Sequence, residues 1–269
     1  EALYVCATSR SHKGSKDREM IRMGSDEAHI KLNVKKNGLP YRIDMHLKKN
    51  KSKGIAVNGI PIKRAVELFG ILNIVCFSPE DLSIIKNGPA ERRRFMDMEL
   101  SQLDKIYLSN LINYNKVVNQ RNKLLKELSF KSSEEKLETL DIWDLQLVRY
   151  GTEVMKRRVG FVQELNEIIG GLHEKLSGGT EKLTIEYQPC VEETAFLDTV
   201  TKMRERDLRM KSTCFGPHKD DLIFFINGSE VKKYGSQGQQ RTAALSLKLA
   251  EIELVKKVVK DTPVLLLDD

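Results

Sequence analysis

The sequence has 269 residues, which is enough for one large domain or for two lobes with cores of their own. Hydrophobic residues make up 40% and charged residues 31%, a balance typical of a soluble globular protein and not of a disordered chain. No stretch approaches the roughly 18 apolar residues that a membrane helix needs, so we expect no membrane partner.

The first residue is Glu1, no signal-peptide pattern follows it, and the four cysteines never form a Cys-x-x-Cys pair. We therefore expect a cytoplasmic protein with reduced thiols, without a structural zinc site, whose natural N-terminus is missing. The formal net charge of +7 is compatible with a polyanionic partner but identifies none. Aromatic residues make up only 6% of the sequence, so we do not first expect a surface that stacks single-stranded bases.

The N-terminal part predicts the end of a helix over residues 1–12 and then β structure. Alternating apolar and polar residues, an apolar run and an Asn58-Gly59 turn predict four strands. These are Ala28–Val34, Tyr41–Leu47, Gly54–Ile62 and a buried strand over Gly70–Phe77. Ser78–Asp81 then predicts a helix start, because acidic residues follow a breaker.

The middle of the chain predicts an αα-hairpin followed by further strands. Apolar residues recur at spacings of three and four from about Pro89 to Leu128. A second amphipathic segment runs from about Leu140 to Leu176 after a polar stretch, so two long helices joined by a short loop are expected. Strands return at Leu183–Tyr187 and Asp221–Ile226.

The end of the chain predicts a helix over Ala243–Val259 and a buried strand over Val264–Leu267 that stops on Asp268 and Asp269. Carboxylates at the C-terminal tip of a strand stand where α/β sheets bind ligands. Asp268 there could hold Mg²⁺ while Asp269 orients the water that attacks a γ-phosphate. The alternative for this motif alone is a strand ending in two solvated acids.

A second candidate site opens the preceding helix. Ser236 is a good N-cap, and Gln237, Gly238 and Gln239 follow it with unpaired backbone N–H groups. Such a terminus binds anions, and Gly238 has no Cβ to keep a phosphate away. By itself, the pattern is more typical of an ordinary capped helix.

The order of these parts resembles the signature motif and Walker B of ABC-type ATPases. The string Ser-Gln-Gly-Gln-Gln-Arg-Thr at 236–242, with Pro-Val-Leu-Leu-Leu-Asp-Asp at 263–269, resembles the RecF family rather than SMC or Rad50 proteins. Blocks at 77–82, 88–97 and 216–222 resemble RecF blocks in the same order. Residues 1–12 resemble the stretch just after that family's Walker A lysine and threonine, so the resemblance covers nearly the whole chain.

The resemblance implies an α/β fold, that of a two-lobed ABC-type ATPase head. Lobe I, similar to P-loop NTPases, would hold residues 1–78 and 259–269. Lobe II would hold residues 79–258, with the αα-hairpin, a small sheet and the signature helix. ATP and Mg²⁺ are the implied cofactors, bound by a head-to-tail homodimer in which Ser236 and Gly238 of one subunit touch the γ-phosphate held by the other.

The implied function is that of a weak DNA-dependent ATPase in recombinational repair, replication and the SOS response. DNA would be bound near single-strand gap junctions, and RecR and RecO would cooperate in loading RecA. The Gly-x-x-x-x-Gly-Lys-[Ser/Thr] loop is absent from the sequence, and any D-loop after Asp269 is absent too. We therefore expect a truncated chain that is inactive as an ATPase by itself.

Two further patterns could be mistaken for a site. Leu176–Thr180 looks like the usual ABC signature, but it ends a helix and leads into a strand, where Gly-Gly is C-cap and turn chemistry. His218, Asp220 and Asp221 could join Asp268 and Asp269 in a metal-dependent nuclease, the alternative function from another class. A structural role at a hairpin edge is the stronger interpretation of the first three.

Two basic clusters are candidates for contacts to DNA phosphates, although each is also typical of a solvated turn. They are Arg92, Arg93 and Arg94 at a helix start and Lys48 and Lys49 in a loop. A passive DNA-binding module is a third possibility. An SMC or Rad50-like head is disfavoured, because the insertion predicts one short hairpin and carries no Cys-x-x-Cys hook.

Overall fold

The computed structural model describes residues 1–130 and 133–268. The chain divides into two compact units, each with hydrophobic core clusters of its own. Unit 1 comprises Glu1–Pro79, Ser101–Lys105 and Glu251–Asp269; unit 2 comprises Glu80–Leu100 and Ile106–Ala250. None of the helices described is both long enough and apolar enough to cross a membrane.

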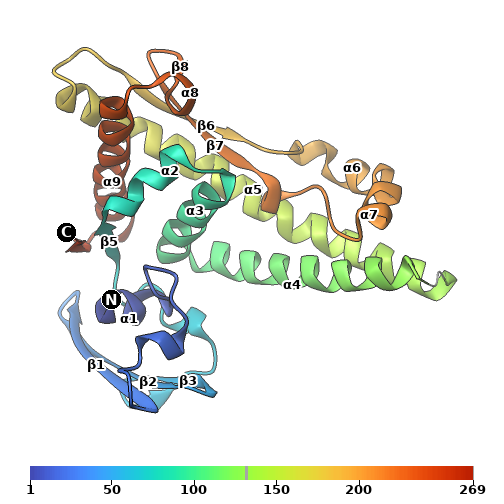
Figure 1. Ribbon diagram of the computed structural model, residues 1–269, viewed down its shortest axis with the longest axis horizontal. Coiled ribbons are helices and arrows are strands. Elements are labelled where there is room, and N and C mark those ends of the chain that lie inside the picture. The colour runs from blue at the N-terminus through green and yellow to red at the C-terminus, as the bar shows by residue number, and fades with distance from the viewer. Residues whose placement is uncertain (131–132, 269) are drawn as a thin grey trace. The chain divides into compact units, whose positions relative to one another are not determined.

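Unit 1 contains an antiparallel meander whose strands occur in chain order (Figure 1). The strands are β1 (Glu27–Lys36), β2 (Leu39–Lys48), β3 (Lys51–Val57) and β4 (Ile60–Pro61). Asn-Gly turns with positive φ at both residues join β1 to β2 and β3 to β4, as the twist of a tight hairpin requires. One face is buried through Ile43, Met45 and Leu47, which alternate along β2.

The rest of unit 1 joins a short helix to two parallel strands. Strand β5 (Ile74–Phe77) pairs with β9 (Val264–Leu267), so both strands end at the same edge. Helix α1 (Ala2–Thr8) packs Tyr4 and Ala7 against β5, and Leu266 of β9 joins this core cluster. Short 3₁₀ turns lie at Asp17–Met20, Ala65–Glu67 and Pro79–Asp81.

Two predictions for these strands need correction. The strand predicted over Gly70–Phe77 begins only at Ile74, because Gly70 has φ +82° and turns the chain. Strand β9 forms as predicted but is not buried, since Leu267 is 78% exposed and Val264 and Leu265 are also exposed. Within the described part of the chain, β9 pairs with β5 alone, so only Leu266 packs into a core cluster.

The other edge of β5 is closed by a side chain. The Gln102 amide accepts a hydrogen bond from the Ile74 N–H at 2.8 Å and donates one to the Ile74 carbonyl at 3.1 Å. Asn73 Nδ2 donates to the Gln102 carbonyl at 3.1 Å. The segment Ser101–Lys105 therefore belongs with β5, although it is the junction between two helices.

Unit 2 is built on the predicted αα-hairpin, α4 (Lys105–Leu128) and α5 (Glu134–Leu176), which run side by side in Figure 1. The helical pattern from Pro89 is two helices, since α3 (Pro89–Leu103) ends before α4 begins. Helix α5 starts earlier than the apolar pattern predicts, because Ser133 caps it by accepting the Lys136 N–H.

A buried ion-pair network ties this hairpin to the segment after it. Arg121 of α4 is fully buried and contacts Asp144 of α5 and Asp207, each at 2.6 Å. Arg204 contacts Asp144 at 2.6 Å from the other side. Since a buried charge is stable only when paired, these residues fix the packing of the helices at this end of unit 2.

A three-stranded antiparallel sheet of order β6-β7-β8 lies along α5. Its strands are β6 (Leu183–Gln188), β7 (Asp221–Ile226) and β8 (Ser229–Glu230). Asn166 of α5 pairs with both backbone groups of Ile185, each at 2.8 Å, and so binds the free edge of β6.

Shorter helices and one long helix complete the fold. The short ones are α2 (Leu82–Lys86), α6 (Phe196–Lys202), α7 (Arg204–Met210) and α8 (Val231–Tyr234), with 3₁₀ turns at Glu193–Ala195 and Pro217–Lys219. The long one, α9 (Gln237–Val259), begins in unit 2 and ends in unit 1.

Candidate functional site

The N-terminus of α9 is a reciprocal capping box. Gln239 N–H donates to Ser236 Oγ at 3.2 Å, and Ser236 N–H donates to Gln239 Oε1 at 2.8 Å. The N–H groups of Gln237 and Gly238, both exposed, have no acceptor within the described chain. A Cβ built on Gly238 would meet only Ser236 Oγ at 3.7 Å, so nothing else crowds the exposed Gly238. The terminus can therefore accept an anion.

The turn that leads into α9 is tightly packed. A Cβ on Gly235 would lie 2.5 Å from the Val231 carbonyl oxygen, so only glycine fits there. Gln240 Nε2 donates to the carbonyls of Val231 and Gly235, at 3.3 and 3.2 Å. The chain thus turns sharply from α8 into α9 and presents Ser236 at the corner.

The capping residue Gln239 is itself held by a chain of side chains. Its Nε2 donates to Glu181 Oε1 at 2.8 Å, and the other oxygen of Glu181 lies 3.1 Å from His173 Nε2. His173, fully buried in α5, forms a second hydrogen bond through Nδ1 to Ser246 of α9 at 2.9 Å. This relay positions the start of α9 against the end of α5.

Sequence reasoning did not identify Glu181 or His173. Each lies at least 58 residues from its partner on α9, so no local pattern marks the contact. The one available signal was His173 itself. It lies in a helix segment with apolar residues in the neighbouring turns, a position typical of a buried ring that has polar partners.

The Leu176–Thr180 segment has the structure that its sequence predicts. Helix α5 ends at Leu176, Gly178 and Gly179 have φ of +67° and +82°, and β6 begins at Leu183. No helix starts there, so the segment offers no row of free amides to a phosphate, and its exclusion is confirmed.

Asp268 follows β9 at the carboxyl edge of the parallel pair. Its N–H donates to the Phe77 carbonyl at 2.9 Å, which continues the ladder by one residue. Its exposed carboxylate pairs with Lys13, Oδ2 to Nζ, at 3.2 Å. The ammonium group of Lys13 therefore contacts the carboxylate that was predicted to hold Mg²⁺. Asp269, the other predicted carboxylate, lies outside the described residues.

Two comparisons with known proteins cover the whole chain. It is 68% identical to the DNA replication and repair protein RecF of Lachnospira eligens and 62% identical to that of Lachnoclostridium phytofermentans, over 269 residues and 74% of each relative. No family model matches. The chain belongs to the RecF family.

Solved structures agree with this assignment. The recombination mediator protein RecF of the RecFOR pathway, solved with ATP and as RecF-ATPrS, is 36% identical and superposes with TM-scores of 0.94 and 0.92. In both cases, the alignment covers all of this chain and 74% of the other. This RecF-family chain therefore has the fold of those RecF structures, a mixed α/β fold in two compact units, as the sequence predicts.

The geometry around His218 does not support the nuclease alternative. His218 uses both ring nitrogens, at 2.6 Å from the Tyr114 hydroxyl and 3.0 Å from the Thr213 carbonyl. Burial lowers the pKa of His218 to about 4, so the ring is neutral and held by these two partners. It does not combine with Asp220 or Asp221 into a group able to hold a metal, among the residues described.

Asp220 and Asp221 serve the core of unit 2 instead. Asp220 is buried, which raises its pKa, and it accepts hydrogen bonds from the Tyr187 hydroxyl and from the Cys190 N–H. Asp221 forms a bidentate pair with Arg92 at 2.6 and 2.9 Å. The structural role preferred from the sequence fits both aspartates.

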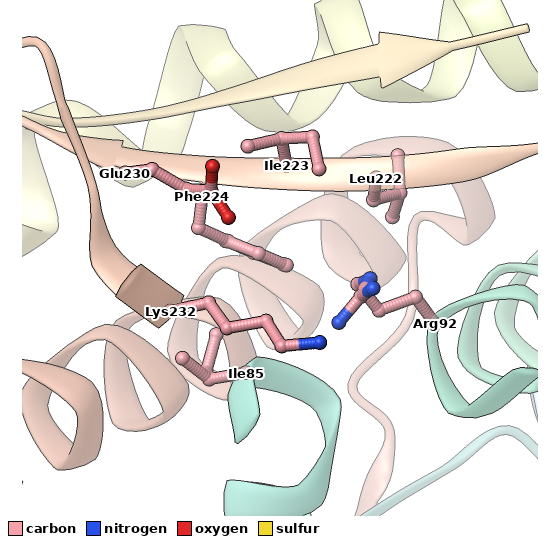
Figure 2. Close-up of a pocket in the computed structure, with 7 residues that line it drawn as sticks. All are labelled: Ile85, Arg92, Leu222, Ile223, Phe224, Glu230 and Lys232. Carbon is pink, nitrogen blue, oxygen red and sulfur yellow. The ribbon is translucent and has the colours of Figure 1, made fainter. Parts of the chain in front are cut away.

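The first basic cluster separates into an interior residue and surface residues. Arg92 is 3% exposed, and its guanidinium also donates to the Asn87 carbonyl at 2.7 Å. Arg92 and Lys232 line a small cavity of about 10 Å³, room for one water. Figure 2 shows these side chains, with Phe224 reaching from the strand toward the helices. Because Arg92 is bound inside unit 2, we leave it out of any DNA surface.

The remaining basic candidates lie at the surface. Arg94 is exposed, and Arg93 is half-buried with one nitrogen on the Asp220 carbonyl at 2.7 Å. In unit 1, Lys48 and Lys49 are about 40% exposed and pair with Glu27 and Asp26, at 3.5 and 3.2 Å. Exposed ion pairs of this kind are weak, so these lysines can exchange their partners for phosphates.

Proposed function

We propose that this RecF-family chain is the ATPase head of an ATP-dependent DNA-binding protein of recombinational repair and replication. The observation that carries the proposal is the start of α9, where the backbone amides of two exposed residues follow the exposed Ser236 cap and only Ser236 Oγ would crowd a Cβ on Gly238. A triphosphate suits this terminus, because its charge complements both the amides and the helix dipole.

The same terminus supports a composite site formed by two subunits. Ser236, Gln237, Gly238 and Gln239 are proposed to contact the γ-phosphate held by a partner subunit, so that ATP joins the two heads. Their rigid turn favours this role, because binding a phosphate would order little further chain. The similarity to a solved RecF-ATP structure supports ATP as the nucleotide.

Asp268 is proposed to hold Mg²⁺, and Asp269 to orient the attacking water. A carboxylate oxygen is the ligand that Mg²⁺ prefers, and Asp268 is exposed at the strand tip as that role needs. When bound, the ion supplies positive charge that offsets the phosphates. The Walker A lysine and amide cradle are not part of this sequence, so the 269-residue chain alone is expected to bind ATP poorly and to be inactive.

The partners are proposed from the pathway in which the similar structures act. Those structures are of a recombination mediator in the RecFOR pathway, which supports cooperation with RecO and RecR in loading RecA at single-strand gaps. A cytoplasmic location and a part in the SOS response are proposed with the family. DNA contact through Arg93, Arg94, Lys48 and Lys49 is supported by their exposure and charge.

The test is binding of a gapped duplex to the full-length protein, measured by anisotropy with and without Mg²⁺–ATP. We expect affinity to rise with ATP and slow hydrolysis to be stimulated by DNA. Equal affinity in both conditions would favour a passive DNA-binding module. Cleavage of the duplex with divalent metal and no nucleotide would favour a nuclease.

A further inference from the structure

Two histidines face each other on the exposed side of the meander in unit 1. His29 of β1 lies directly opposite His46 of β2 in the strand register. Their rings are stacked, with centroids 3.9 Å apart and planes inclined by 25°. On the other side of His46, the register places Gly54, which has no side chain to cover the pair.

A carboxylate spans the two rings. Glu27 lies two residues before His29 on the same face of β1. Its Oε2 is 2.8 Å from His46 Nε2, and its Oε1 is 3.9 Å from His29 Nε2. One ligand atom from each of the three residues lies within 4.8 Å of the others. Among the residues described, no other three His, Cys, Asp or Glu side chains meet this condition.

The donor set is specific about the kind of cation. Two imidazoles and one carboxylate with an open fourth position are the ligands of Zn²⁺ and its neighbours in the transition series, whereas Mg²⁺ prefers oxygen ligands alone. A hydrogen bond from His46 lowers the pKa of Glu27, so the carboxylate is charged at neutral pH. Coordinated carboxylates must be charged in this way.

We propose that Glu27, His29 and His46 form a surface site for a divalent transition-metal ion, Zn²⁺ in the first place. The ion would take the position between the carboxylate and the two Nε2 atoms and leave its fourth position to water or another ligand. The proton of each imidazole would then reside on Nδ1. The three side chains, all exposed or half-buried, would have to rotate so that both Nε2 lone pairs point at the ion.

Lys48 is the competitor of the ion in the present arrangement. Its Nζ lies 3.5 Å from Glu27 Oε2, so the ammonium group neutralises part of the ligand charge. Replacing Lys48 by glutamine should therefore strengthen metal binding. The proposed metal site does not involve the nucleotide, so its test is independent of the proposed function.

The experiment is isothermal titration of the full-length protein with ZnCl₂ in excess Mg²⁺. We expect one ion per chain, binding weakened at least about tenfold in His29→Gln and in His46→Gln, since loss of even an outer partner of a metal ligand costs roughly 10–100-fold. His12→Gln, a histidine outside the group, should bind as the parent does, and Lys48→Gln should bind more tightly.

Two results of the titration would overturn the proposal. One is absence of Zn²⁺ binding, and the other is binding that is equal in the parent, His29→Gln and His46→Gln. Absorption of the Co²⁺-loaded parent gives a second reading that needs no variant. Ligand-field bands without sulfur-to-cobalt charge transfer are expected, whereas charge-transfer bands would assign the ion to the cysteines and contradict the site.

Discussion

Asp268 and Asp269 carry different proposed roles at neighbouring positions. Many ABC ATPases have glutamate after the Walker B aspartate; the aspartate here is shorter by one methylene, about 1.5 Å of reach. Misplacement near 1 Å can lower a rate about a hundredfold, so slow hydrolysis is expected. This would suit a clamp timed by ATP rather than a motor.

In the full-length protein, Asp269→Asn should keep ATP-bound dimers and nearly abolish turnover, because Asp268 still holds Mg²⁺. Asp268→Asn should weaken Mg²⁺–ATP binding itself. Calorimetry and a phosphate-release assay separate the two effects. If both variants lost binding and turnover alike, this division of roles would be wrong.

Glu181 is the residue through which the start of α9 is fixed to α5. Its two oxygens accept from Gln239 and contact His173, and an alanine could serve neither of them. Glu181→Ala should lower the free energy of unfolding by about 1–3 kcal/mol, the cost of leaving a buried polar group without its partner. Urea denaturation measures this, with Glu186→Ala on the exposed face of β6 as the matched control. If both variants lost the same free energy of unfolding, the contacts of Glu181 would not stabilise the start of α9.

Among the elements, helix α5 contains glycines with opposite surroundings. A Cβ on Gly151 would lie 2.6 Å from the Phe196 ring, whereas a Cβ on Gly171 would have nothing within 4 Å. Gly151 therefore allows close packing of α6 against α5, and Gly171 does not serve packing at all.

Gly151→Ala should destabilise the protein by about 1–3 kcal/mol through overpacking. Gly171→Ala in the same helix should stabilise it by roughly 0.5–1 kcal/mol, because alanine favours the helix. Thermal denaturation of both variants compares them. Stabilisation by Gly151→Ala would show that α6 does not pack on α5 in this way.

At this scale, local patterns predicted most elements and failed where distant contacts decide. The Asn58-Gly59 turn and the αα-hairpin are visible in the sequence because turn chemistry and apolar spacing are local. The break between α3 and α4 is not, since it places Gln102 on β5, 28 residues away. Likewise, the Ser236 cap is predictable, whereas the burial of Arg92 depends on Asp221, 129 residues later.

For the whole molecule, the net charge of +7 gains meaning only through its distribution. If Lys and Arg contact phosphates, log affinity for duplex DNA should fall with log salt by roughly 0.9 for each phosphate neutralised. Arg94→Gln, and separately Lys48→Gln with Lys49→Gln, should each reduce this slope. Anisotropy titrations at several salt concentrations measure this slope. If replacing a cluster leaves the slope unchanged, that cluster is not part of the DNA surface.

The central claim is that the start of α9 completes a nucleotide site on a second subunit. Sedimentation of the full-length protein with Mg²⁺–ATP, as parent and as Ser236→Arg, tests it most directly. Loss of the Ser236 cap costs only about 1 kcal/mol, so folding and monomer ATP binding should persist. Because Ser236 is exposed, the bulky arginine should block the partner's γ-phosphate. The account predicts ATP-dependent dimers for the parent and monomers for the variant. Normal dimers of Ser236→Arg with ATP would contradict it.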